Sequence, residues 1–312
     1  MRPAVAIGAL VALALAGSTV RMSSAAFTAR GQFTSTISTA ADWVAPALTL
    51  TAPTDGSYQK STSVTLAGAA GNATGDSTTV TVDLYTGTTA TGTPSSTQSV
   101  TRSAATWTTT VTGLAAGTYT ARATQTDTGG NTATTATTTF TIDTTAPTRV
   151  SVSAANGTGT AGHLDAGDTI TFAYSEPMLA SSILAGWTGS SAATVNVRFF
   201  NGTTDAFTVL DSASAANVKL DAGTAAGGGI SLGSTANYVT STVTFGATMT
   251  RSADGTSFVV TLGSPDIASR VVATAVAAKN MTWTPKAGPT DLAANALAST
   301  ATWTETDNDR DF

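Results

Sequence analysis

Residues 113–123 read Gly-Leu-Ala-Ala-Gly-Thr-Tyr-Thr-Ala-Arg-Ala, a turn followed by a run in which apolar and polar residues alternate. In an extended chain this alternation puts Tyr119, Ala121 and Ala123 on one side and the polar side chains on the other. A period of two is typical of a half-buried antiparallel strand. The stretch therefore predicts a sheet with one face toward a core.

Similar alternating runs fill the region from Leu48 to residue 143. Turn-forming Gly, Pro, Asn and Asp residues separate them at 53–56, 71–72, 92–94 and 129–131. About seven short strands with no helical period between them indicate a β-sandwich. The residues predicted to face inward are Val64, Leu66, Val80, Val82, Leu84, Trp107, Val111, Tyr119, Ala121, Ala123, Phe140 and Ile142.

Three motifs in this region carry a family resemblance. They are residues 52–56 (Ala-Pro-Thr-Asp-Gly), 107–111 (Trp-Thr-Thr-Thr-Val) and 127–131 (Asp-Thr-Gly-Gly-Asn). Together they resemble the bacterial Ig-like domains of secreted and surface proteins. The resemblance implies an immunoglobulin-like sandwich over residues 47–143. Leu114 followed by Tyr119 looks like its tyrosine corner, in which the Tyr hydroxyl bonds back to the backbone.

A linker at residues 144–149 leads into a second unit at 150–304, and its Pro147 favours an extended approach. Residues 156–178 resemble the opening of another group of bacterial Ig-like domains. Residues 291–297 resemble that group's final hairpin, with Ala294 where Gly is usual. The predicted fold class is all-β, two tandem immunoglobulin-like antiparallel β-sandwiches after an N-terminal signal peptide.

The second unit is longer than the roughly 100 residues of a minimal sandwich, so extra strands or an insertion are expected. One short helical turn is predicted at residues 181–186 and a loop at 227–229. Further strands are predicted at 195–200, 207–210, 243–245, 258–262 and 271–276.

The N-terminus combines Arg2, an apolar run and then small residues through Ala26. This order predicts a secretory signal peptide at 1–26 and an extracellular or cell-surface location. Residues 27–46 are a lead-in spacer with one strand at 32–37, and 305–312 form an acidic tail. The apolar run is shorter than the ~20 residues of a membrane span, so the alternative membrane contact is an uncleaved, interfacial signal segment.

Composition excludes several classes of function. Charged residues make up 11% of the chain, the net charge is −5, and the 14 Lys and Arg are scattered singly, which argues against a nucleic-acid partner. The sequence contains no cysteine, which excludes disulfides, a thiolate nucleophile and cysteine-bound metals. Core packing must therefore stabilise the fold.

Few residues are candidates for chemistry. His163 is the only histidine, and no Gly-x-Ser-x-Gly motif is placed on a strand-to-helix turn to pair with it. Asp165, Asp168 and Glu176 are the densest acidic group, and a glycosidase would need two such carboxylates about 5–10 Å apart. We expect no enzyme, no catalytic residue and no bound cofactor.

Calcium is the one metal that these acids favour, through Asp165 and Asp168 and with Asp291 and Asn295 as further oxygen ligands. The spacing does not match an EF-hand loop. The structural alternative is that each Asp bonds its own turn backbone. The matching Asp-to-Asn spacings at 127–131 and 291–295 are interpreted as hairpin turns.

Two of the five tryptophans, Trp43 and Trp187, lie outside the clear periods and are the candidates for exposed ligand contact. Trp107, Trp283 and Trp303 are expected in the cores. The leading hypothesis is a non-catalytic secreted or cell-surface protein whose modules are structural or adhesive. The alternatives are a carbohydrate- or cell-wall-binding module and, last, an unusual hydrolase using the acidic group. The partner is an unknown surface protein or polysaccharide.

Overall fold

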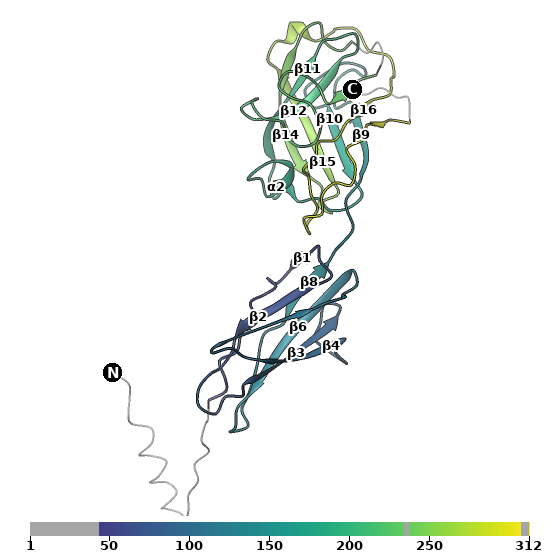
Figure 1. The fold of residues 1–312 in the computed structure, drawn as a ribbon. Coiled ribbons are helices and arrows are strands. Elements are labelled where there is room, and N and C mark those ends of the chain that lie inside the picture. The colour runs from purple at the N-terminus through teal and green to yellow at the C-terminus, as the bar shows by residue number, and fades with distance from the viewer. Residues whose placement is uncertain (1–43, 234–236, 307–311) are drawn as a thin grey trace, which may run out of the picture. The chain divides into compact units, whose positions relative to one another are not determined.

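A computed structural model describes residues 44–233, 237–306 and 312 of the chain. Within these residues the fold is all-β (Figure 1), and helix is confined to α2 (Ala180–Ile183) and the 3-10 turn η1 (Ala268–Arg270). No helix in this part of the chain is long and apolar enough to cross a membrane. The predicted signal peptide and the predicted strand at 32–37 lie outside the described residues.

Eight strands form the first sandwich. One sheet has the order β1-β8-β6-β3-β4, with β7 paired to β6, and the other contains β2 and β5. Residues 49–52 extend the second sheet, because Thr49 N and Thr51 N donate to Ala69 O and Ala67 O at 3.0 and 2.8 Å. The strands are β1 (Ser57–Gln59), β2 (Val64–Ala69), β3 (Thr79–Thr86), β4 (Ser96–Thr101), β5 (Thr106–Val111), β6 (Gly117–Thr126), β7 (Thr132–Thr134) and β8 (Thr138–Ile142).

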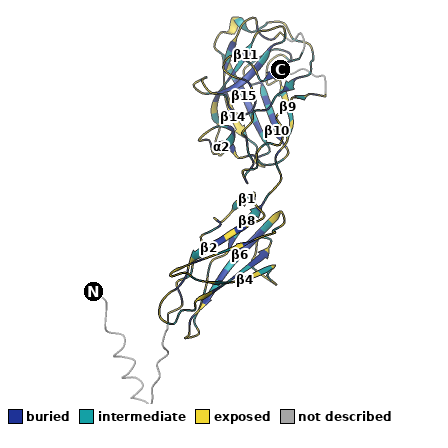
Figure 2. Ribbon diagram, viewed as in Figure 1, coloured by how far each residue is buried: buried dark blue, intermediate teal, exposed yellow. Residues whose placement is uncertain are grey.

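The core of this sandwich consists of the alternating residues that the sequence predicted. Val82 on β3, Ala121 on β6 and Phe140 on β8 are each at most 1% exposed, and buried and less buried positions alternate along the strands (Figure 2). The predicted apolar inward positions are confirmed, while Thr109, which alternates in register with Trp107 and Val111, is only partly buried. The others that are buried are Val64, Leu66, Val80, Leu84, Trp107, Val111, Tyr119, Ala123 and Ile142.

The predicted tyrosine corner is also confirmed. The Tyr119 hydroxyl donates a hydrogen bond to Ala115 O at 3.1 Å, and its ring stacks on Phe140 with centroids 5.9 Å apart. Gly117, between them, has a φ of 143°, a left-handed value that favours glycine. The bond fastens the loop before β6 to the edge of the core.

Nine strands form one sheet in the second sandwich, in the order β17-β16-β13-β12-β11-β14-β15-β10-β9. The sheet doubles over on itself, because Phe172 and Tyr174 on β10 pack against Trp283 on β16 with centroids 5.5 and 5.7 Å apart. The strands are β9 (Arg149–Ala155), β10 (Thr169–Tyr174), β11 (Ala193–Phe200), β12 (Ala206–Asp211), β13 (Ile230–Ser231), β14 (Val243–Arg251), β15 (Ser257–Pro265), β16 (Thr282–Trp283) and β17 (Trp303–Thr304).

Most strands predicted for this unit are present. The predictions at 195–200, 207–210, 243–245 and 258–262 fall within β11, β12, β14 and β15, and the predicted helical turn overlaps α2. The strand predicted at 271–276 is wrong. Val272 N donates to Tyr238 O and Val276 N to Gly162 O, so this segment bonds to separate loops and not to a neighbouring strand. Phe312, in the predicted tail, is buried against Phe199 and Tyr238.

The linker is hydrogen-bonded at both of its ends. Asp143 N donates to Gln59 O at 2.9 Å in the first sandwich. Pro147 O accepts from Ala298 N at 2.8 Å, and Thr148 N donates to Ser175 Oγ at 2.9 Å, both in the second. The junction is thus built from specific contacts on each side.

Replacing Tyr119 with Phe tests the tyrosine corner. We expect the free energy of unfolding of the first sandwich to fall by about 1 kcal/mol, because the ring stays packed while Ala115 O loses its donor. Urea unfolding followed by tryptophan fluorescence measures the change. Tyr58→Phe is the control, since Tyr58 is 42% exposed on β1 and should have no effect. Equal loss in both variants would refute the role given to this hydroxyl.

Candidate functional site

The Asp165 and Asp168 carboxylates organise the loop before β10. Asp168 is fully buried, and its two oxygens accept from Gly157 N at 2.9 Å and Asp165 N at 2.7 Å. Asp165 accepts from Thr160 N at 3.3 Å. Burial raises the pKa of Asp168 above its ordinary value, against the opposing effect of these two amide donors. Both side chains therefore serve the turn backbone, and calcium binding here stays a prediction.

The acidic group seen in the sequence is divided by β10. Asp168 precedes this six-residue strand and Glu176 comes after its end, so a strand about 20 Å long at ~3.3 Å per residue separates them. A glycosidase pair needs a separation of about 5–10 Å. An extended strand thus separates Asp168 from Glu176, and a catalytic use of this acidic group stays a prediction.

Ser231, in the Gly-x-Ser-x-Gly sequence of this chain, lies in a strand, and His163 lies in a loop. Residues 229–233 read Gly-Ile-Ser-Leu-Gly, but Ser231 lies in β13 and pairs with Ala206 and Thr282 within the sheet. His163 lies in the loop before β10, where its backbone N donates to Thr160 O at 3.1 Å. Neither residue is at the strand-to-helix turn on which such a nucleophile is presented.

Trp187, one of the two predicted ligand contacts, is 7% exposed. Its Nε1 donates to Ser191 O at 2.8 Å and its ring lies 5.8 Å from that of Phe258. One side borders a pocket of about 390 Å³, lined also by Leu179, Ala180, Ser181, Gly186 and Thr188. Trp43 lies outside the described residues. Ligand contact through either residue stays a prediction.

The other tryptophans are structural, as predicted. Trp107 and Trp283 are 2% and 0% exposed, and Trp283 Nε1 donates to Leu220 O at 2.9 Å. Trp303 is partly buried against the second core. Trp107 Nε1 donates to both Thr49 O and Ala69 O, at 3.0 and 3.1 Å. The indole N–H groups of Trp107 and Trp283 therefore have backbone partners, as buried tryptophans require.

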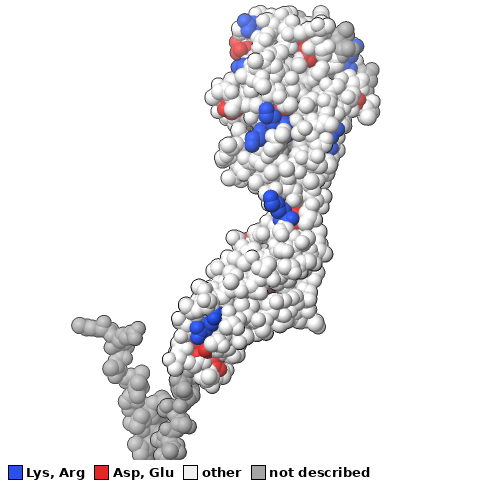
Figure 3. Space-filling model, in the orientation of Figure 1, with Lys and Arg blue, Asp and Glu red and all other residues white. Residues whose placement is uncertain are grey.

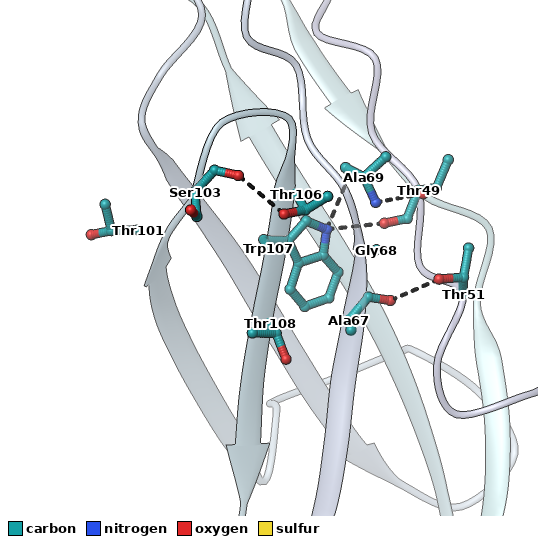
Figure 4. Close-up of a pocket in the computed structure, with 10 residues that line it drawn as sticks. All are labelled: Thr49, Thr51, Ala67, Gly68, Ala69, Thr101, Ser103, Thr106, Trp107 and Thr108. Carbon is teal, nitrogen blue, oxygen red and sulfur yellow. Dashed lines mark hydrogen bonds between the residues drawn. The ribbon is translucent and has the colours of Figure 1, made fainter.

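A hollow of about 520 Å³ lies over Trp107 on the first sandwich (Figure 4). Threonines from residues 49–51 and from β5 flank a floor made by Ala67, Gly68 and Ala69 of β2. A Cβ at Gly68 would overlap Thr49 O, so glycine is required for the two segments to pair. The ten lining residues offer hydroxyl and methyl groups and no titratable side chain.

Three carboxylates meet where the linker reaches the second sandwich. Asp143 follows β8, Glu176 follows β10, and Asp291 belongs to the final hairpin, yet their oxygens lie within 4.8 Å of one another. The backbone of Asp291 bridges to Met178, which holds the hairpin beside the end of β10. We call these three residues the junction carboxylates.

Asn295 connects the junction carboxylates to the linker backbone. Its backbone N and its Nδ2 donate to the two oxygens of Asp291, both at 2.8 Å, and Nδ2 also donates to Asp143 O at 2.8 Å. Asn131 bonds Asp127 in the same way, at 2.8 and 2.7 Å. Both predicted hairpin turns are confirmed. Ala294 adopts a φ of 65°, and Gly130 is its counterpart with a φ of 89°.

The surroundings of Glu176 favour its protonated form. Burial, then the negative charges of Asp143 and Asp291, and then a side-chain hydrogen bond with Asp143 raise the pKa of Glu176 from 4.5 to about 7. Its Oε1 is buried and has no hydrogen-bond partner. Sequence reasoning included Glu176 and Asp291 among calcium ligands but missed Asp143. A signal for it exists, because the pattern Asp-x-x-Ala-Pro occurs before both sandwiches, at 42–46 and 143–147.

These features define a chain of immunoglobulin-like β-sandwich modules. Residues 85–144 match the family model of the bacterial Ig-like domain, which confirms the resemblance over that stretch. Among solved structures, the fibronectin(III)-like modules of Clostridium thermocellum CbhA are similar at 13% identity and a TM-score of 0.26, covering 70% of this chain and 89% of that chain. A likeness at this level adds nothing to the fold described above. No curated protein matches the chain.

Changing Asp168 to Asn tests the structural role of this carboxylate. We expect a loss of about 1–3 kcal/mol in the free energy of unfolding, because an amide NH2 would then face a backbone N–H donor in a buried position. Thermal unfolding by circular dichroism measures it. Asp83→Asn is the control, since Asp83 lies on the outer face of β3 and accepts only from the exposed Thr97 hydroxyl. An Asp168 variant as stable as the control would contradict the assignment.

Proposed function

We propose that this chain is a non-catalytic secreted or cell-surface protein whose Ig-like sandwiches act as structural and adhesive modules. The observation that carries the proposal is the linker. Asp143, Pro147 and Thr148 form specific backbone contacts with the sandwiches on either side. A chain that only tethered two independent units would not need them. Such contacts suit modules that must transmit force or hold a surface in place.

The use of the buried carboxylates supports a non-catalytic role. Asp168, Asp205 and Asp221 are fully buried, and the oxygens of each accept backbone N–H groups. Asp221 also accepts from the Thr208 hydroxyl at 2.6 Å. Burial raises the pKa of Asp221 to about 6, with Thr208 and the amide donors opposing the shift. These carboxylates accept hydrogen bonds from the backbone N–H groups of buried loops. A substrate has no access to them there.

The free sheet edges support an adhesive role toward another protein. Strands β4 and β5 end their sheets in the first sandwich, and neither contains a charged residue or a proline. Natural edge strands use those residues to prevent pairing with another chain. Charged side chains are also few and scattered over the face shown in Figure 3. An extended segment of a surface protein could pair with such an edge.

A carbohydrate-binding module is the alternative. The threonine-lined hollow of Figure 4 offers hydroxyl groups to a sugar. Sugar sites, however, stack the ring of the ligand on an exposed aromatic face, and the rings at hand, Trp107 and Trp187, are 2% and 7% exposed. An exposed ring among the described residues is that of Tyr58 on β1, 42% exposed, and Trp43 lies outside them.

Localisation and ligand class can be tested together. We expect the protein in the extracellular or surface fraction of the cells that make it, with its N-terminus at residue 27, because residues 1–26 have the order of a secretory signal. N-terminal sequencing of fractionated material measures this. The purified chain should neither hydrolyse nor bind a panel of cell-wall and capsular polysaccharides. Intracellular protein retaining Met1 would contradict the localisation. Saturable glycan binding lost in Trp43→Ala or Trp187→Ala would establish the alternative.

A further inference from the structure

The loop at residues 87–95, which connects β3 to β4, is rich in hydroxyl groups (Figure 1). It reads Gly-Thr-Thr-Ala-Thr-Gly-Thr-Pro-Ser, and the chain has no charged residue between Asp83 and Arg102. Segments rich in serine and threonine that also contain proline are typical sites of O-glycosylation. We call the four threonines of this loop the acceptor threonines; they are Thr88, Thr89, Thr91 and Thr93.

The acceptor threonines are all exposed, and the loop that presents them is fixed at both ends. Gly87 N donates to Thr118 O at 2.8 Å. Ser95 N donates to Leu84 O at 2.7 Å. Between these bonds the loop borders open space, because a Cβ added at Gly87 or Gly92 would meet no atom within 4 Å. The loop therefore has room for a bulky group on its side chains.

The hydroxyl groups of this loop differ from those on the strands. On β6 and β8, Thr120 Oγ1 lies 3.1 Å from Thr139 Oγ1, so these threonines pair within the sheet. In the loop, Thr89 Oγ1 and Thr91 Oγ1 pair only with each other, at 3.1 Å. Among the described residues, nothing hydrogen-bonds to the hydroxyl groups of the other two acceptor threonines. These hydroxyl groups are thus free to react, whereas the paired ones are committed to the fold.

We propose that the acceptor threonines are O-glycosylated by a transferase of the producing cell, which uses a phosphate-activated sugar. A bond forms between the threonine Oγ and the anomeric carbon of the sugar, while the bond from that carbon to the phosphate oxygen breaks. The phosphate leaves with the electron pair, and the hydroxyl proton passes to a base of the transferase. The inference goes beyond the proposed function, because it assigns a covalent modification.

Glycans at this place would also protect a sheet edge. The loop ends at Ser95, and β4 (Ser96–Thr101) begins at the next residue. Natural edge strands use charge or proline to prevent pairing with another chain, and β4 has neither. Hydrated sugars beside β4 would obstruct such pairing, so the adhesive contact would fall to β5. This last step rests on the proposed function, whereas the modification itself does not.

Mass spectrometry of the intact protein, purified from the cells that make it, tests the proposal. We expect species heavier than the polypeptide by whole sugar residues. Fragmentation that leaves glycosidic bonds intact should place the added mass on residues 88–93. Replacing all four acceptor threonines with Ala should remove that mass and leave the thermal unfolding midpoint unchanged, since exposed loop side chains contribute little to stability. The matched control is Thr106→Ala with Thr108→Ala, two exposed threonines within β5, which should keep the full added mass.

Mapping also separates enzymatic glycosylation from spontaneous sugar addition. The exposed amine of Lys60 can react with a free reducing sugar without a transferase, and the added mass would be similar. The proposal is overturned if the protein has the mass of the polypeptide alone. It is also overturned if the added mass lies on Lys60 or on strand threonines and persists in the variant without acceptor threonines. Neither result would affect secretion or the absence of hydrolysis, on which the proposed function is tested.

Discussion

The indole of Trp107 lies between the sheets of the first sandwich, and that of Trp283 lies between the layers of the second. Each brings together strands that do not pair through hydrogen bonds, and each has its N–H bonded to backbone oxygen. With no cysteine in the chain, burial of one face of every strand is what stabilises the fold. The rest of the architecture depends on the two cores that these indoles fill. The loops, the tyrosine corner and the linker are all attached to the strands around those cores.

Although the chain is poor in charged residues, six of its 19 acidic residues are buried in the part that the structure describes. Asp127 and Asp291 accept from the Asn that ends each hairpin, and Asp168 joins two turns of a loop. These roles explain why acidic residues recur at equivalent places in modules of different length. The junction carboxylates differ from them, because Glu176 keeps an oxygen without a hydrogen-bond donor.

The sequence predicts the first sandwich well, because a period of two reports directly which side chains face a core. It also predicts the tyrosine corner, since the loop and Tyr119 are adjacent in the chain. It fails at 271–276, where apolar residues such as Val272 bond to separate loops. Asp168 and Glu176 are close in the sequence, which suggests that their side chains lie together, but the strand β10 separates them. Asp143 and Asp291 are 148 positions apart, and only the folded hairpin brings them together.

We propose that the chain consists of two separately folded modules joined in series by a structured linker. Single-molecule force spectroscopy on the full chain tests it most directly. The account predicts two distinct unfolding events that lengthen the chain by about 30 and about 50 nm, from residues 47–143 and 150–304 at ~3.5 Å per residue less the folded lengths. A single unfolding event of about the summed length would contradict it, because it would show one cooperative unit.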